Sequence, residues 1–308
     1  MQTSNHSDTL DNISYSLVKE AFETGSEFSK KELAGLTQLP LEIVAALIER
    51  MLESGEIKKS GLGKFVINKN YVFYLCIKVK PKTIDCIVFD STYSEAARKS
   101  TEKSALDLQI QLAGIIDSVR KNYNLACIAL SVQLPVKDGI IYENGKAFDL
   151  KTQLEQKYGI SVFIEKEINL VCFGNISEKQ IQFLDNEYSV CLHISETGIQ
   201  CGLIYKTEIL TGFQGIAGEI GLLNIGGSTL NQMAQNSTTD ADKLLQNLIK
   251  TVNVMYNPKT VIIYNELQSP KSENAVSENQ TIIYAADYEA KCESGFVYLI
   301  KKRTSIFC

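Results

Sequence analysis

The first part of the chain carries apolar side chains at a spacing of three to four residues, the period of an amphipathic helix. Three such runs are present, at residues 12–24, 29–36 and 41–54. Gly25 and Gly55 follow the first and third runs, and Ser29 with Glu32 has the spacing of a capping box at the second. Two short β runs around a Gly-x-Gly turn complete the order of a winged helix-turn-helix, which we predict over residues 1–70.

From residue 71 the pattern changes to short apolar runs that alternate with amphipathic stretches, the order of an α/β fold. Strands are predicted at 74–80, 83–90 and 127–132, as a hairpin at 188–206, and at 260–266, with helices at 104–123, 240–255 and 293–300. The polar stretches 228–240 and 269–280 are expected to lack regular structure. We predict two α/β lobes, at 71–180 and 181–308, the second of them short.

The bulk composition agrees with this organisation. Hydrophobic residues make up 44% of the 308 residues, enough to bury the cores of about two to three domains. The net charge of −5 gives no general attraction to nucleic acid or membranes. No apolar run is long enough to cross a bilayer, and the polar N-terminus lacks a signal pattern. We therefore expect a cytoplasmic protein without a membrane partner.

Eight cysteines are scattered along the chain, and no two form a C-x-x-C pair. They are Cys76, Cys86, Cys127, Cys172, Cys191, Cys201, Cys292 and Cys308. Seven of them lie in apolar or amphipathic surroundings, where cysteine behaves as a small hydrophobic residue. Structural zinc needs closely spaced ligand pairs, so we predict neither disulfides nor a metal site.

The third helical run stands where a recognition helix would, yet its outward positions are unusual for a reader of the major groove. These positions are Glu42, Ala45, Ala46, Glu49 and Arg50. Residues 1–70 hold eight Lys or Arg against ten Asp or Glu, but the hairpin has four lysines in twelve residues and no acid among them. The candidate DNA contacts are Lys58, Lys59, Lys64, Arg50, Ala45 and Ala46. The alternative is a solvated hairpin whose lysines protect its edge.

A glycine-dense stretch, Thr211 to Gly227, holds the second candidate site. Glu219 is the only ionisable side chain between Glu208 and Asp240. A carboxylate on such a turn can lie where backbone approaches a ligand, because glycine has no Cβ to block the approach. The alternative is a tight interdomain crossing in which Glu219 only caps the next turn.

The motif G-x-x-G-x-A-G-E-I-G, which ends at Gly221, resembles the signature of the ROK family of bacterial sugar kinases and sugar-responsive repressors. The preceding E-T-G-I-Q-C-G and further segments follow the order of that family over most of the chain. The resemblance implies a two-lobed body with the actin-like ATPase fold of sugar kinases and Hsp70. Repressors of the family have an N-terminal winged helix-turn-helix, which most of its kinases lack.

The nucleotide-binding turns of the family are altered here. Its D-x-G-G-T turn corresponds to K-V-K-P-K at residues 78–82, where no glycine is present and Pro81 has no N–H to donate. Glu196 and Gln200 replace glycines of the second phosphate turn, and Tyr264 is the first of three residues that replace the closing glycines. We expect no nucleotide cofactor.

The sugar-binding positions are also altered. Glu167 stands where the family has its catalytic Asp, and Lys166, which is placed to pair with it, stands where the family has a sugar-binding Asn. Leu222 stands where the family has a His that contacts both sugar and zinc. His193, on a predicted strand, is expected to be a core histidine. The candidate ligand contacts are Glu219, Glu167, Lys166 and Gly218. The alternative for Glu167 is a charge cluster at the entry of a helix.

Three hypotheses follow from these residues. The first is a transcriptional regulator that binds DNA as a homodimer or larger oligomer, with a sugar-like effector and no enzymatic activity. The second is a divergent sugar kinase that uses Glu167 as its base. The third is a non-enzymatic scaffold whose acidic third helix binds a protein partner.

Overall fold

The computed structural model describes residues 4–104, 107–143, 145–178, 187–236, 240–267, 275–276 and 280–304. The chain divides into two compact units. Unit 1 contains Met1–Ala129, Tyr158–Val162 and Lys301–Cys308, and unit 2 contains Leu130–Lys157 and Phe163–Ile300.

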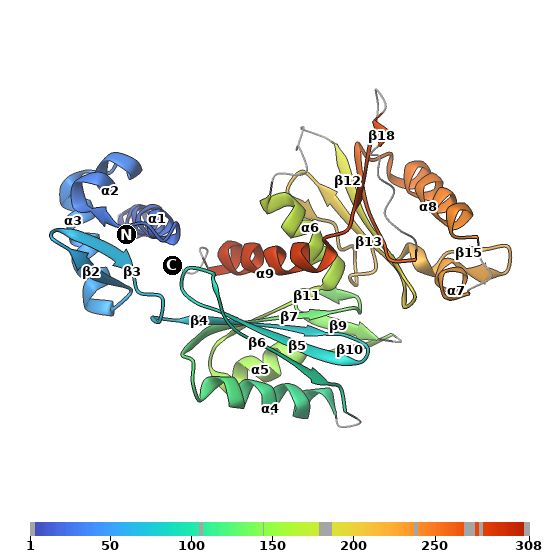
Figure 1. Cartoon of the computed structure of the whole chain (residues 1–308), viewed down its shortest axis with the longest axis horizontal. Helices are drawn as coiled ribbons and strands as arrows, with labels where there is room; N and C mark the ends of the chain where they lie inside the picture. The colour runs from blue at the N-terminus through green and yellow to red at the C-terminus, as the bar shows by residue number, and fades with distance from the viewer. Residues whose placement is uncertain are drawn as a thin grey trace. The chain divides into compact units, whose positions relative to one another are not determined.

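Unit 1 begins with three helices and a small antiparallel sheet in the order β1-β3-β2 (Figure 1). The elements are α1 (Ser4–Glu23), β1 (Phe28–Ser29), α2 (Lys30–Thr37), α3 (Leu41–Ser54), β2 (Ile57–Gly61) and β3 (Lys64–Ile67). Phe22, Leu33 and Ile48 meet in their fully buried core. The three helices and the hairpin are confirmed, except that α1 begins earlier than the predicted residue 12.

The capping box at α2 forms as predicted. Glu32 N–H donates to Ser29 Oγ at 3.3 Å, and Ser29 N–H donates to Glu32 Oε2 at 2.7 Å. The hydrogen bond from the Ser29 backbone lowers the pKa of Glu32. Gly55 ends α3 with a φ of 84°, a left-handed conformation that glycine adopts without a steric penalty.

A five-stranded sheet follows, in the order β11-β7-β4-β5-β6. Its strands and the helices next to them in sequence are β4 (Phe73–Val79), β5 (Thr83–Phe89), β6 (Glu95–Glu102), α4 (Leu108–Arg120), β7 (Leu125–Val132), α5 (Leu150–Tyr158) and β11 (Ser161–Lys166). The division between the units falls within β7 and β11. The strands β4, β5 and β7 and the helix α4 are confirmed, but β6 was not predicted. Its sequence, EAARKSTE, is charged and almost fully exposed, as suits the edge of a sheet, and lacks the apolar alternation of a half-buried strand.

Unit 2 contains a six-stranded sheet in the order β14-β13-β12-β17-β19-β18 (Figure 1). The strands are β12 (Tyr188–Ser195), β13 (Gly198–Tyr205), β14 (Glu208–Ile209), β17 (Thr260–Asn265), β18 (Ala275–Val276) and β19 (Thr281–Ala285). The helices are α6 (Glu167–Ser177), α7 (Leu230–Gln235), α8 (Ala241–Tyr256) and α9 (Tyr288–Thr304), the last of which ends in unit 1. The 188–206 hairpin, the 260–266 strand and the helix at 240–255 are confirmed. The last helix is confirmed and is longer than predicted.

Short elements complete unit 2, and they correct one prediction. They are β8 (Val136–Lys137), β9 (Ile140–Glu143), β10 (Lys146–Phe148), the 3-10 helix η1 (Ile220–Leu222), β15 (Asn224–Ile225) and β16 (Ser228–Thr229). The stretch 228–240 was expected to be irregular, but it contains β16 and α7. Thr229 and Gln232 cap α7 reciprocally, and Leu230 anchors it in the core with 0% exposure. Most of the predicted loop at 269–280 lies outside the described residues.

Seven cysteines among the described residues are buried, in agreement with their prediction as small hydrophobic residues. Burial raises the pKa of Cys127 to about 12. No group of three or more potential metal ligands occurs among the residues with described placement. Within the same residues, no helix is both long and apolar enough to span a bilayer.

Candidate functional site

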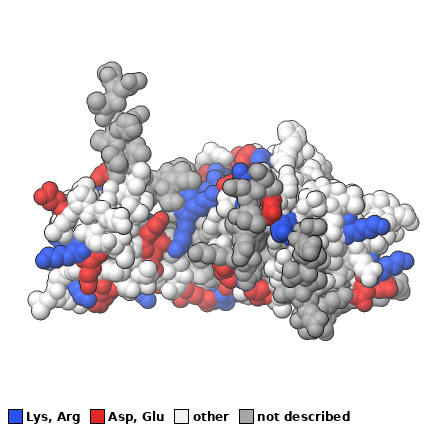
Figure 2. Space-filling view, turned by 90° about the horizontal axis from the view of Figure 1, so that it is seen from above, with Lys and Arg blue, Asp and Glu red and all other residues white. Residues whose placement is uncertain are grey.

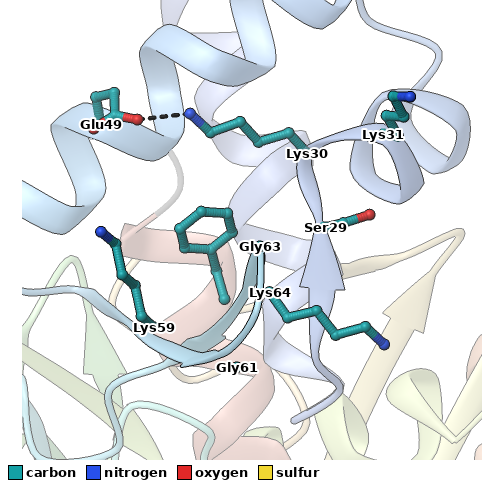
Figure 3. A pocket seen from close by; sticks show the side chains of 9 residues that line it. Ser29, Lys30, Lys31, Glu49, Lys59, Gly61, Gly63 and Lys64 are labelled. Atoms are coloured by element: carbon teal, nitrogen blue, oxygen red, sulfur yellow. Dashed lines mark hydrogen bonds and ion pairs between the residues drawn. The ribbon is translucent and has the colours of Figure 1, made fainter.

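A groove of about 510 Å³ opens between the start of α2 and the β2–β3 hairpin (Figure 3). Its lining is Ser29, Lys30, Lys31, Glu49, Lys59, Gly61, Gly63, Lys64 and Phe65. The N-cap Ser29 places two lysines directly at the beginning of α2, and each hairpin strand contributes one more. We call these nine residues the lysine groove.

The pairing of the hairpin strands separates Lys58 from the neighbouring Lys59. Lys59 lies opposite Phe65, and Lys58 lies opposite Val66. Since side chains alternate between the two faces of a strand, Lys58 points away from the face that carries Lys59. Phe65 is 6% exposed, and its ring lies 5.9 Å from Lys30 Nζ, so it forms an apolar base beneath the charges.

One carboxylate enters the lysine groove from α3. Lys30 Nζ donates to Glu49 Oε1 at 2.6 Å, the bond drawn in Figure 3, and this bond lowers the pKa of Glu49. Lys59 also contributes to the lowered pKa of Glu49, and Lys64 to the lowered pKa of Glu32 beside the groove, so four lysines have two carboxylates nearby. On the face of the molecule seen in Figure 2, by contrast, basic and acidic side chains are interspersed. The lysine groove is therefore a local concentration of positive charge.

The structure divides the predicted DNA contacts. Lys59 and Lys64 line the groove, whereas Lys58, Ala45, Ala46 and Arg50 do not. Arg50 Nη1 lies 3.1 Å from Asp11 Oδ2, and its guanidinium lies 4.9 Å from the centre of the Tyr15 ring, so it is held against α1. Sequence reasoning missed Lys30 and Lys31, although two lysines directly after a helix N-cap were a visible signal.

The glycine-dense stretch is explained by packing within unit 2. A Cβ on Gly215 would overlap the backbone of Val136, one on Gly218 the carbonyl oxygen of Cys201, and one on Gly221 the side chain of Asn231. Gly218 also has a φ of 83°. The stretch thus crosses β8 and β13 at backbone distance. The crossing is tight, as the alternative expects, but it lies within unit 2, and the Glu219 side chain makes no capping hydrogen bond to η1.

Two of the predicted ligand contacts meet each other. Lys166 is the N-cap of α6, and its Nζ hydrogen bonds to Glu219 Oε1, the residue just before η1. The side chain of Lys166 is 3% exposed and that of Glu219 is 18% exposed. Glu167 is buried at the first turn of α6 and accepts a hydrogen bond from Gln133 Nε2 at 3.0 Å. Its position is that of a charge at a helix entry.

Protein contacts close the turn at residues 78–82. In the 78–82 turn, Lys80 N–H donates to Thr83 O at 2.9 Å and Lys80 Nζ lies 2.9 Å from Asp85 Oδ2, so an ion pair closes the hairpin.

His193 is 4% exposed, and its ring stacks on that of Tyr288 with 3.8 Å between the ring centres. Its Nε2 lies 2.9 Å from Glu266 Oε1. The prediction of a buried core histidine is confirmed.

Comparison with known protein families supports the signature that the sequence shows at residues 196–221. A profile described as the ROK family matches residues 74–231, just over half of the chain. The chain belongs to the ROK family. This match includes Lys166, Glu167, Gly218 and Glu219, and it leaves out the lysine groove.

Relatives within the ROK family include repressors and kinases. The xylose repressor of Bacillus subtilis (strain 168) is 26% identical over 232 residues, which are 68% of this chain and 59% of the repressor. The structure of a ROK family transcriptional regulator, a homologue of the E. coli MLC protein, superposes with a TM-score of 0.67 at 13% identity and covers 96% of this chain and 97% of that one. The ROK hexokinase from Thermus thermophilus superposes with a TM-score of 0.53 at 17% identity over 75% of this chain and all 100% of that one.

These likenesses show that the ROK chain has the fold of the family's sugar kinases in its α/β part. The regulator structure matches nearly the whole chain, and the hexokinase matches three quarters of it. The chain spans only 59% of the length of the xylose repressor.

Proposed function

We propose that this ROK protein is a transcriptional regulator that binds DNA through an N-terminal winged helix-turn-helix. The observation that carries the proposal is the lysine groove, whose lining contains four lysines from α2 and the hairpin and one carboxylate, Glu49 of α3. Several ammonium groups along one open groove suit the spaced phosphates of a nucleic-acid backbone. The likeness to the xylose repressor and to the MLC homologue supports a regulator.

Under this proposal the α/β part binds an effector or forms the oligomer, and it does not transfer phosphoryl groups. Glu167, at the position of the base, is buried and hydrogen bonded to Gln133. The 78–82 turn presents lysines and a proline where a phosphate cradle needs free backbone N–H groups. A sugar or sugar derivative is the proposed effector, and the regulator is proposed to act as a homodimer or larger oligomer in the cytoplasm.

The test is binding of the purified full chain to DNA from upstream of its own gene, followed by fluorescence anisotropy across a salt series. We expect selective binding whose logarithmic affinity falls linearly with the logarithm of the salt concentration, with a slope near −0.9 for each phosphate contacted. Equal affinity for a scrambled duplex would contradict the proposal. ATP-dependent phosphorylation of a sugar by the same preparation would instead support a divergent kinase.

Replacing Glu49 with Gln is expected to strengthen DNA binding about threefold to tenfold at low salt. The change removes the carboxylate that Lys30 now contacts at 2.6 Å, so that this ammonium can turn to a phosphate. Anisotropy at two salt concentrations measures the effect, which should shrink at the higher one. Glu53→Gln, an exposed glutamate on the same helix outside the groove lining, is the matched control and should change the affinity little.

A further inference from the structure

The ion pair of Lys166 and Glu219 occupies the place in unit 2 where the sequence proposes a ligand contact. Glu219 Oε1 accepts from Lys166 Nζ, and this is the one acceptor that the described residues give the ammonium. With the Lys166 side chain 3% exposed, water cannot solvate the charge fully. A buried ammonium is stable only when it is paired, so Glu219 is held by an internal cation.

Backbone contacts fix Lys166 in this position. It is the last residue of β11 and the N-cap of α6. Its own N–H donates to Glu165 Oε1 at 2.9 Å. The side chain of Lys166 therefore starts from a fixed strand-to-helix junction, which limits the positions that its ammonium group can reach.

Glu219 is fixed equally well. Glu219 N–H donates to Ile216 O at 3.1 Å, and Leu222 N–H donates to Glu219 O at 3.1 Å. Gly218 and Gly221, on either side, lie against β13 and Asn231 so closely that neither has room for a Cβ. Because both backbones are held, the pair forms with little loss of conformational freedom on either side.

We propose that Lys166 is a resident internal ligand of Glu219 and that it closes this site to neutral hydroxyl-bearing molecules such as monosaccharides. A hydroxyl that donates to Glu219 would have to displace the ammonium and leave it buried without a partner. Breaking a buried ion pair costs more than one hydroxyl–carboxylate hydrogen bond returns. The inference deepens the proposed function, on which it rests, because it narrows the proposed effector: while Lys166 is in place, the site excludes a neutral sugar and leaves a sugar derivative as the effector.

The test is calorimetric titration of the full chain, without DNA, with a panel of neutral aldopentoses and aldohexoses. The unchanged protein should show no saturable binding. Lys166→Ala removes the ammonium and opens space beside Glu219, so at least one sugar should bind at least about tenfold more tightly than to the unchanged protein. Adding Glu219→Gln to Lys166→Ala should abolish the gain, because a hydroxyl then loses its charged acceptor.

Lys291→Ala is the matched control. Lys291 is also a lysine with a 3% exposed side chain, but it pairs with Glu178 and Asp287, so its removal should bring no sugar binding. Should Lys166→Ala fail to fold by circular dichroism, Lys166→Gln takes its place, since a neutral amide can exchange its bond to Glu219 with a hydroxyl.

Two results would overturn the inference. One is a folded variant at position 166 that binds no sugar better than the unchanged protein, and the other is tight binding of a neutral sugar while Lys166 is present. Neither readout depends on DNA. Failure of the proposed DNA binding would therefore leave this result interpretable.

Discussion

The double variant Lys59→Ala/Lys64→Ala should bind upstream DNA about 100-fold more weakly at low salt than the unchanged protein. Both side chains line the lysine groove from the two strands of the hairpin. If each neutralises one phosphate, the slope of log affinity against log salt should become shallower by about two. The loss should be nearly the same for every DNA sequence, because phosphate contacts carry no sequence information. Anisotropy over a salt series measures affinity and slope together.

Lys58→Ala supplies a control with the same change of charge. Lys58 neighbours Lys59 on β2 and is exposed, but it lies on the other face of the strand, opposite Val66. Its removal should change the affinity by about threefold or less through long-range screening alone. If Lys58→Ala alone weakened binding as much as the double variant does, net charge would account for the effect and the groove would not.

Gly218→Ala should destabilise unit 2 by about 3 kcal/mol or more. Glycine at this position has a φ of 83°, which L-residues rarely adopt, and a Cβ would overlap the carbonyl oxygen of Cys201. Since that oxygen belongs to the backbone of β13, no side-chain rotation can relieve the overlap. Chemical denaturation followed by circular dichroism measures the loss. We expect a lower denaturant concentration at the unfolding midpoint, with partial unfolding of unit 2.

Gly226→Ala is the control that separates the cost of backbone strain from the cost of steric overlap by a Cβ. Gly226 has a φ of 65°, but a Cβ there would meet nothing within 4 Å. Its replacement should cost about 1 kcal/mol, from backbone strain alone. A Gly218→Ala protein that kept normal stability and lost only ligand binding would show that Gly218 serves a ligand and not the crossing of the chain.

Several elements could be predicted because their signals lie within a few neighbouring residues. Ser29 and Glu32 form the capping box that their spacing indicates, and Gly55 ends α3 in the left-handed conformation. The hairpin at 188–206 forms from two apolar runs separated by a short turn. In each case the interaction joins residues that are close in sequence, so the pattern contains both partners.

The strand β6 and the helix α7 are two of the elements that were missed, because their signals are weak at the level of sequence. The charged strand β6 is stabilised by its pairing with β5, from Thr83 opposite Glu102 to Phe89 opposite Glu95. The helix α7 has only six residues, of which three are polar, and it depends on Leu230 and Ala234, which are buried against the core of unit 2. Tertiary contacts override local preference in both cases.

The sequence by itself determined the N-terminal order of three helices and a hairpin, the family signature around Glu219 and the loss of the glycines that a phosphate cradle needs. Only the tertiary structure decided which side chains meet. It joined Lys166 to Glu219 across 53 positions of the chain, turned Lys58 away from the lysine groove and brought Lys30 beside Glu49. Spacing predicts local periodicity and caps, whereas the partner of a buried charge depends on which distant segment packs against it and on the cost of leaving that charge unpaired.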